Sequence, residues 1–181
     1  MKYFIVSDIH GSAFYCRKAL EAYRREGADR MLLLGDILYH GPRNPLPEEY
    51  DPPAVAKMLN AMKNEILCVR GNCEAEVDQM VLAFPVMADY ALLAAGSHMI
   101  FMTHGHLFNT EKLPPLMDGD ILLHGHTHLS VCEDHGSYVY MNPGSVSLPK
   151  EDHPHGYMTF DGSEFLWKTL DGEIYRRHKL S

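Results

Sequence analysis

The sequence lacks the features that would place a protein in or across a membrane. None of its hydrophobic runs approaches the roughly 18 consecutive apolar residues that a transmembrane helix needs. The opening run from Tyr3 to Val6 meets Asp8 too soon for a secretory signal peptide. The four cysteines form no C-x-x-C pair, which argues against a disulfide framework and a thiolate zinc site. We therefore expect a cytoplasmic protein without membrane contacts.

Basic charge is also scarce. The 181 residues carry 16 lysines and arginines against 24 aspartates and glutamates, a formal net charge of −8. We do not expect nucleic acid as a partner, because its binders usually carry a basic face. The sequence contains no G-x-S-x-G, no G-x-x-x-x-G-K and no H-E-x-x-H. These absences argue against serine hydrolases with a nucleophile elbow, P-loop kinases and zincins.

The first half has the pattern of an α/β protein. Short apolar runs at 2–7, 31–34 and 65–69 predict buried strands, and the segments between and after them predict helices near 13–26, 52–62 and 74–82. This alternation implies parallel strands with right-handed crossovers. Such sheets bind ligands at the carboxyl ends of their strands.

The second half has the pattern of consecutive short strands. Runs at 90–94 and 98–103 flank Gly96-Ser97 and predict a hairpin, and further strands are expected near 121–124, 138–141, 156–160, 165–170 and 173–176. We expect these strands to be mostly antiparallel and to form a second sheet packed on the first.

Polar clusters follow five of the expected strands. Twelve histidines are present, and several belong to these clusters: Asp8-Ile9-His10, Gly35-Asp36, Gly71-Asn72, His104-Gly105-His106 and Gly125-His126-Thr127-His128. Oxygen and nitrogen donors without thiolate suit Mn²⁺, Fe or Zn²⁺. Seven donor side chains are too many for one metal unless several lie outside its coordination shell, whereas two metals sharing a bridging carboxylate would use them all. A pair of this kind clamps a phosphate and activates water.

The order of these motifs resembles the calcineurin-like metallophosphoesterase family. Further segments are similar to the small bacterial YfcE-type phosphodiesterases: Gly41-Pro42-Arg43-Asn44, Arg70-Gly71-Asn72-Cys73, Val77-Asp78-Gln79-Met80, Thr103-His104-Gly105-His106-Leu107-Phe108 and Asn142-Pro143-Gly144-Ser145-Val146-Ser147. The resemblance covers about residues 1–160. It implies one metallophosphoesterase domain over 1–181, with an α/β fold of two packed mixed β-sheets flanked by helices in a four-layer sandwich.

The resemblance also implies a metal-ligand set. Asp8, His10 and His128 would bind the first ion, Asn72, His104 and His126 the second, and Asp36 would bridge both. The expected cofactors are two divalent ions per chain, Mn²⁺ first, with Fe, Zn or Ni as alternatives. The expected reaction is hydrolysis of a small phosphodiester by a metal-bridging hydroxide. A phosphomonoesterase of the same fold and a non-catalytic interaction scaffold are the alternatives, and a dimer or tetramer is open.

Other residues near the motifs are candidates for substrate contact. Many relatives have histidine after the G-N pair, where this sequence has Cys73. Cys73 is therefore either a packing residue or a weak general acid, because its thiol is a poorer proton donor than imidazolium. Arg43 and Asn72 are candidates for phosphate binding, and Arg43 is also a candidate for a subunit contact. His106 is expected to support the metal ligands from behind, and Arg70 to form a structural salt bridge.

Overall fold

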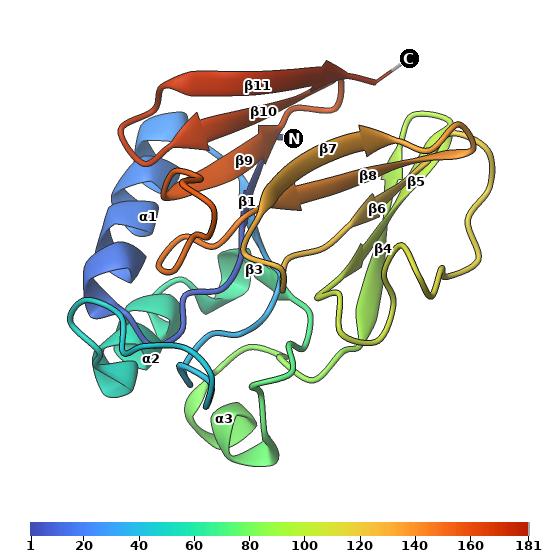
Figure 1. The fold of residues 1–181 in the computed structure, drawn as a ribbon. Helices are drawn as coiled ribbons and strands as arrows, with labels where there is room; N and C mark the ends of the chain where they lie inside the picture. Colours follow the sequence, from blue (N-terminus) through green and yellow to red (C-terminus); the bar gives the residue numbers. More distant parts are fainter. Residues whose placement is uncertain (181) are drawn as a thin grey trace.

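The computed structural model describes residues 1–180 and consists of two β-sheets that pack face to face (Figure 1). In spatial order, the first sheet contains β11 (Ile174–Lys179), β10 (Glu164–Thr169), β9 (Gly156–Phe160), β1 (Tyr3–Val6), β2 (Arg30–Leu33) and β3 (Ile66–Cys68). β1, β2 and β3 are mutually parallel, as predicted. Their carboxyl ends therefore lie at one edge of the sheet.

Two helices cover the outer face of this sheet. α1 (Ala13–Glu26) begins at Ser12, whose hydroxyl oxygen accepts a hydrogen bond from the Tyr15 amide, and ends at Gly27 in the left-handed conformation. α2 (Pro52–Asn60) begins at Asp51, whose carboxylate accepts from the Ala54 amide at 3.0 Å. Both starts were predicted, because a polar cap satisfies amides that have no partner inside the helix.

The second sheet contains five strands. In spatial order they are β4 (Tyr90–Ala95), β5 (His98–Thr103), β6 (Asp120–Leu123), β8 (Tyr138–Pro143) and β7 (Ser130–Asp134). β5, β6 and β8 run parallel to one another, and the two outer strands are antiparallel to their neighbours. The core between the sheets includes Ile5, Leu32, Met102, Ile121 and Trp167, all buried.

The prediction that all strands of the second half form the second sheet was wrong. β9, β10 and β11 extend the first sheet, where β9 pairs antiparallel with β1. All five residues of β9 are buried, because α1 covers one face of the first sheet and the second sheet covers the other. β7 was not predicted, because this partly exposed edge strand has only a short apolar stretch around Val131 and Cys132.

The predicted fold class, two packed mixed sheets flanked by helices, is confirmed. The outer layers are unequal, however. On the five-stranded sheet, Phe108 and Leu116 from the irregular segment 104–119 pack against Phe101 and Leu122. Within residues 1–180, no helix covers that outer face. The remaining helical segments are short: η1 (Lys63–Glu65) precedes β3, and α3 (Glu76–Val81) follows it. α3 lies at the lower end of the molecule (Figure 1).

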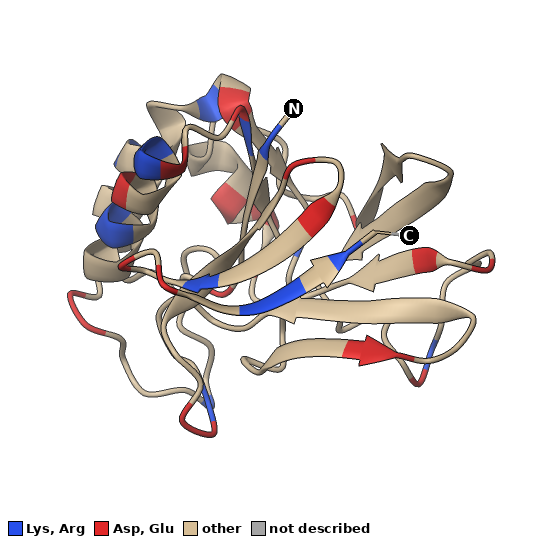
Figure 2. Cartoon of the chain, turned by 90° about the horizontal axis from the view of Figure 1, so that it is seen from above, with Lys and Arg blue, Asp and Glu red and all other residues tan. Residues whose placement is uncertain are grey.

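Charged residues of both signs are mixed along the chain. Figure 2 shows lysines, arginines and acidic residues interspersed on α1. Within residues 1–180, no helix is both long and apolar enough to cross a membrane.

Candidate metal centre

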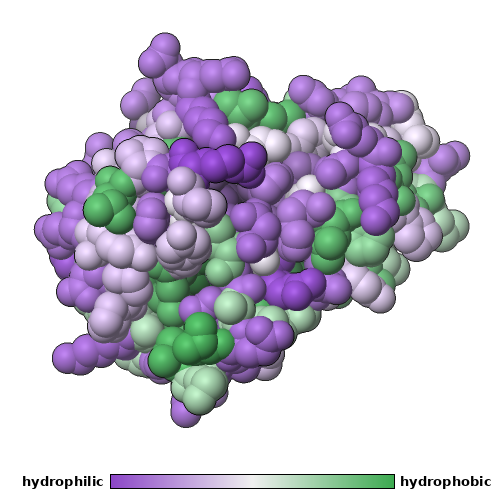
Figure 3. Space-filling view, turned by 60° about the horizontal axis from the view of Figure 1, so that its bottom comes forward, coloured by the Kyte–Doolittle hydropathy of each residue, from purple (hydrophilic) through white to green (hydrophobic). Residues whose placement is uncertain are grey.

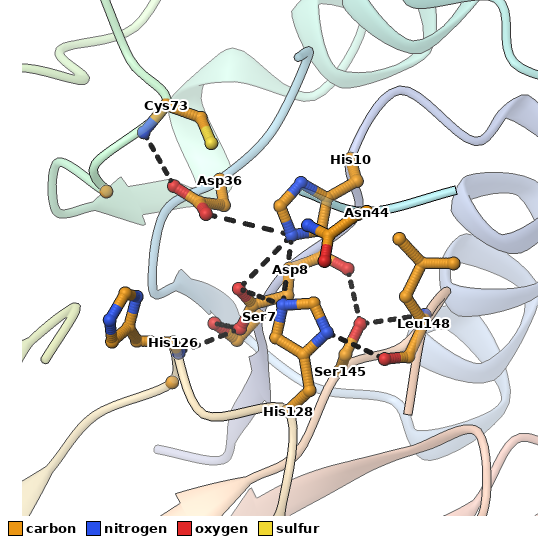
Figure 4. Close-up of polar contacts among 12 residues, drawn as sticks. Ser7, Asp8, His10, Asp36, Asn44, Cys73, His126, His128, Ser145 and Leu148 are labelled. Atoms are coloured by element: carbon orange, nitrogen blue, oxygen red, sulfur yellow. Dashed lines mark hydrogen bonds and ion pairs between the residues drawn. The ribbon is translucent and has the colours of Figure 1, made fainter. Parts of the chain in front are cut away.

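The loops after the strands bring the predicted polar clusters to one end of the molecule. Asp8 and His10 follow β1, and Asp36 and Asn72 come after β2 and β3. His104 follows β5, and His126 and His128 come after β6. Because the sheets pack face to face, donors from both meet between them, and Figure 4 shows several of these side chains pointing toward one another.

The backbone at five of these residues adopts the left-handed conformation. The φ angles are 57° at Asp8, 51° at His10, 55° at Asp36, 68° at His126 and 63° at His128. This region is strained for residues with a Cβ, and Asp, Asn and His tolerate it better than most. Such strain gathers at functional sites. The left-handed backbone here forms the tight turns that carry the donor side chains.

Two glycines allow the loops to approach the carboxylates closely. A Cβ on Gly71 would lie 2.1 Å from Asp36 Oδ1, and a Cβ on Gly125 would lie 1.9 Å from Ser7 Oγ and 2.7 Å from Asp8 Oδ2. Only glycine fits at such positions. The glycines of the G-N and G-H-x-H motifs therefore have a steric role.

Asp8, His10 and His128 form a first group of buried donors. The Nε2 atoms of His10 and His128 are 3.1 Å apart, and they lie 3.5 and 3.3 Å from Asp8 Oδ1. Each ring donates its Nδ1–H to a carbonyl, His10 to Tyr39 at 2.8 Å and His128 to Leu148 at 2.7 Å. In the neutral rings both Nε2 lone pairs would therefore face each other. A positive charge, either a proton or a metal ion, is needed between them.

Asp36, Asn72 and His104 form a second group next to the first. His104 donates its Nδ1–H to the Leu34 carbonyl at 2.6 Å. Its Nε2 lies 3.2 Å from Asn72 Oδ1 and 3.4 Å from Asp36 Oδ1. The other oxygen of Asp36 lies 3.7 Å from His10 Nε2. Asp36 therefore presents one oxygen to each group.

The carboxylates of the site favour their charged forms. Burial opposes the charge on Asp8, but the neighbouring His10 and His128 rings hold its pKa well below the usual range. Burial likewise opposes the charge on Asp36, whose pKa is lowered by its hydrogen bond with His104. For His104, burial opposes the positive form, yet Asp36 and Asp8 raise its pKa to about 9. Together these groups favour a bound cation.

The remaining predicted histidines lie beside the second group. The His126 amide donates to Asp8 Oδ2 at 3.1 Å, and the His126 ring lies 5.0 Å from the His104 ring. The ring of His106 lies 5.5 Å from that of His104. Burial, together with the charges on His104 and His126, lowers the pKa of His106 to about 4, so its ring stays neutral at pH 7.

Cys73 faces the same centre. Its amide donates to Asp36 Oδ1 at 2.9 Å, and its sulfur lies within 4.8 Å of donor atoms of both His10 and Asp36 (Figure 4). Burial and the charge of Asp36 raise the pKa of the Cys73 thiol. The thiol therefore keeps its proton.

A cavity of about 400 Å³ opens over the centre. Asp36, Asn72, Cys73 and His128 are among its lining residues, together with Arg43 from the proline-rich loop. Arg70 does not line it, and its guanidinium lies 2.6 Å from the Asp89 carboxylate, which confirms the predicted salt bridge. Figure 3 shows a mostly hydrophilic surface at this end of the molecule.

Glu74 is the main residue of the site that the sequence did not reveal. Its buried carboxylate accepts hydrogen bonds from the amides of Asp36, Ile37 and Gly71 at 2.9, 2.7 and 2.5 Å. It therefore fixes the loop of Asp36 against the loop of Asn72. Its position after Gly71-Asn72-Cys73 was the only available signal.

Two serines were also missed. The hydroxyls of Ser145 and Ser147 donate to the Asp8 carbonyl at 2.8 and 2.9 Å. They belong to the segment Asn142–Ser147, which contributed to the family resemblance but suggested no role.

The donors fit divalent cations. Asp8 Oδ1 is buried and has no hydrogen-bond partner among residues 1–180. Three sets of donor atoms each lie within 4.8 Å of one another: Asp8 with His10 and His128, Asp8 with Asp36 and His104, and His10 with Asp36 and Cys73. Carbonyl groups that fix the Nδ1–H of metal-binding histidines are the usual support of such ligands.

Comparison with known proteins agrees with this geometry. The model of the calcineurin-like phosphoesterase superfamily domain matches residues 1–164. Phosphodiesterase YfcE of Escherichia coli strain K12 is 47% identical over 161 residues, which cover 89% of this chain and 88% of the relative. The solved structure of E. coli YfcE, a phosphoesterase, superposes with a TM-score of 0.96 at 43% identity and covers 100% of both chains.

A more distant structure shares the fold alone. Vacuolar Protein Sorting 29 from Cryptosporidium parvum superposes with a TM-score of 0.63 at 16% identity, covering 98% of this chain and 97% of that one.

The family model and the 47% identical relative confirm the resemblance seen in the motifs, and with it the implied enzyme class, a metal-dependent phosphoric ester hydrolase. The chain belongs to the calcineurin-like phosphoesterase superfamily.

Proposed function

We propose that this chain is a phosphodiesterase that uses two divalent metal ions, Mn²⁺ first among them. The observation that carries the proposal is Asp36, whose two oxygens face two adjacent groups of donors. Asp8, His10 and His128 would hold one ion and Asn72, His104 and His126 the other, with Asp36 shared. When bound, the pair would supply a bridging hydroxide as nucleophile and withdraw charge from the phosphate.

The other residues of the cavity would bind and orient the substrate. Arg43 would donate to a non-bridging phosphate oxygen, because guanidinium matches phosphate geometry. Cys73 would face the leaving oxygen with its thiol, since its sulfur lies within 4.8 Å of donor atoms of both His10 and Asp36. His106 would keep the His104 and His126 rings in place from behind.

Two points support a diester substrate and catalysis. The 47% identical relative is named a phosphodiesterase. All seven predicted metal ligands are present, and an interaction scaffold would not need them. Hydrolysis of monoesters alone would favour a phosphomonoesterase of the same fold. A chain that binds no metal would favour a non-catalytic interaction scaffold.

The first experiment is a turnover screen. Purified protein stripped of metal is tested on 4-nitrophenyl diesters and monoesters with Mn²⁺, Zn²⁺, Fe²⁺ and Mg²⁺, and bound metal is measured in parallel. We expect close to two ions per chain and the fastest turnover with a diester and Mn²⁺. Turnover that persists in excess chelator would exclude the proposal.

Asp36→Asn tests the shared carboxylate. We expect metal-dependent turnover to fall more than about 100-fold, because this group would serve both ions. The far-ultraviolet circular dichroism should stay that of the parent, since asparagine tolerates the left-handed backbone at this position. The matched control is Asp51→Asn, which conserves the helix cap of α2 and should keep full activity.

A further inference from the structure

One arginine and one lysine line the cavity, and they come from separate segments of the chain. Arg43 comes from the loop after Gly41, and Lys150 comes from the turn after Leu148. Among residues 1–180, neither forms an ion pair, whereas Lys2, Arg17 and Lys168 each pair with a carboxylate. Two unpaired positive charges therefore border one cavity in a chain whose net charge is −8.

The turn that carries Lys150 is attached to a candidate metal ligand. The Lys150 amide donates to the His128 carbonyl at 3.2 Å, and the His128 ring donates to the Leu148 carbonyl at 2.7 Å. These two bonds hold the segment 148–150 beside the centre. The next residues, Glu151 and Asp152, have φ angles of 54° and 59°, and neither lines the cavity or forms an ion pair with Lys150.

The charges of the proposed centre leave Lys150 without a task in binding a simple diester. Two divalent ions exceed the charges of Asp8 and Asp36 by 2 × 2 − 2 = +2, which the diester anion and its hydroxide nucleophile, each singly negative, would balance. The cavity volume of about 400 Å³ lies in the range of pockets for whole small molecules, about 300–1,000 Å³. It therefore has room for a substrate arm beyond the reacting phosphate.

We propose that Lys150 is a specificity-determining residue that binds a second anionic group on the substrate. The substrate class is then a phosphodiester with a terminal phosphate on one arm. This inference rests on the proposed function, because it assumes that the reacting phosphate lies on the metal centre. An ammonium group recognises a terminal phosphate as a compact positive charge with three donors.

The test compares two substrates that differ at one position. They are 4-nitrophenyl 3-hydroxypropyl phosphate and the same diester with a phosphate on the 3-hydroxyl, which share the reacting phosphate and the leaving group. We expect wild-type protein with Mn²⁺ to prefer the charged diester by kcat/KM. Lys150→Gln should lower this preference about tenfold through KM, Lys150→Glu should lower it further, and Lys150→Arg should restore most of it.

A control and a binding measurement separate this inference from the function it rests on. Lys57→Gln removes an exposed lysine of α2 that does not line the cavity, and it should leave the preference unchanged. Calorimetry with the two matching phosphonates, in which a methylene group replaces the oxygen that joins phosphorus to the nitrophenyl ring, should give the same tenfold change in Kd, because these analogues keep the negative charge and cannot release 4-nitrophenol. If wild-type protein hydrolyses neither diester, the proposed function fails. If it hydrolyses both and Lys150→Gln leaves their ratio unchanged, only the role of Lys150 is wrong.

Discussion

Glu74 connects the ends of two strands through a single side chain. One of its oxygens accepts from the amides of Asp36 and Gly71, and the other accepts from Ile37. Burial and the charge of Asp36 raise the pKa of Glu74, while the three amides oppose that rise. The side chain thus sets the distance between the loops that carry Asp36 and Asn72.

Replacement of Glu74 by glutamine should weaken both the fold and metal binding. The amide nitrogen of glutamine cannot accept a hydrogen bond, so at least one buried backbone amide loses its partner, at a cost of about 1–3 kcal/mol. Metal affinity should fall roughly 10–100-fold, as for other residues that orient ligands. Urea unfolding and Mn²⁺ titration measure the two effects. Glu76→Gln, an exposed neighbour on α3, is the control, and equal behaviour of the two variants would contradict this role.

Cys73 should influence the choice of leaving group. Its thiol lies at the centre, but it is a weak proton donor. We expect Cys73→His to accelerate diesters with poor leaving groups more than those with 4-nitrophenol, because imidazolium donates a proton more readily. Rates across a series of phenols of rising pKa give the slope of this dependence. An unchanged slope and rate would leave Cys73 as a packing residue.

Individual donors could be predicted from the sequence, but their supports could not. Asp8, His10 and Asp36 follow apolar runs, and that position alone suggested a common site. The Tyr39 and Leu148 carbonyls that orient the imidazoles are backbone atoms, which any residue would supply. Lys150 was missed for a related reason, since its place beside His128 depends on a long-range backbone hydrogen bond.

At the level of elements, a partly buried charge cluster joins α1 to β9, β10 and Lys2, the residue before β1. The carboxylate of Glu26 on α1 accepts from the Lys168 ammonium at 2.9 Å, the Lys2 ammonium at 2.8 Å and the Tyr157 hydroxyl at 2.7 Å. Burial opposes the charge on Glu26, but Lys168 and Lys2 lower its pKa to about 2. The cluster therefore fixes α1 on the first sheet and favours an ionised Glu26.

Glu26→Gln should reduce stability in a way that depends on pH. Because the folded pKa lies below the unfolded value near 4.5, the stabilisation is full above that pH and is lost as the pH falls toward 2. At pH 7 the variant should lose roughly 2–3 kcal/mol, less than for a fully buried pair because Lys2 is partly exposed. Urea unfolding between pH 7 and pH 3 should show the two proteins converging. Glu21→Gln, exposed on the same helix, should follow the wild type throughout.

The order of the strands shows where prediction from sequence ended. The parallel strands β1 to β3 follow from alternation with helices, and they were predicted. The pairing of β9 with β1 depends on which buried strand can complete the open side of β1, and the local pattern of Gly156–Phe160 does not contain that information. β7 is short and half-exposed, so its periodicity was too weak to recognise.

For the whole molecule, the centre lies where the two sheets meet. Asp8 and His10 come from the first sheet, whereas His104 and His128 come from the second. Ions bound between them would connect both sheets. We propose that residues 1–181 form one domain, and thermal unfolding should then give one cooperative transition.

Metal removal should lower the melting temperature. Ions that bind only the folded state stabilise it by about 2.7 kcal/mol per site at a concentration of 100 times Kd. For a chain of this size this predicts a decrease of about 5–10 °C per site with a chelator. Differential scanning calorimetry with Mn²⁺ or chelator measures the change. Asp36→Asn should show a much smaller difference between the two conditions, and an identical melting temperature of the wild type in both would argue against a metal centre.

Assembly and location stay predictions at this scale. We expect a location in the cytoplasm, and a dimer or tetramer is open, with Arg43 and the proline-rich loop as one candidate subunit contact. Sedimentation equilibrium and cell fractionation would test the two expectations.

The left-handed backbone also determines which substitutions remove a donor from this centre without straining the chain. It occurs at Asp8, His10, Asp36, His126 and His128. Alanine at these positions would add a backbone penalty of about 1–2 kcal/mol to the loss of a donor, so alanine scanning would mix two causes. Asparagine and glycine tolerate the conformation and would isolate the side-chain effect. By the same reasoning, a lineage that lost its metals while keeping this fold would drift toward asparagine and glycine at these five sites.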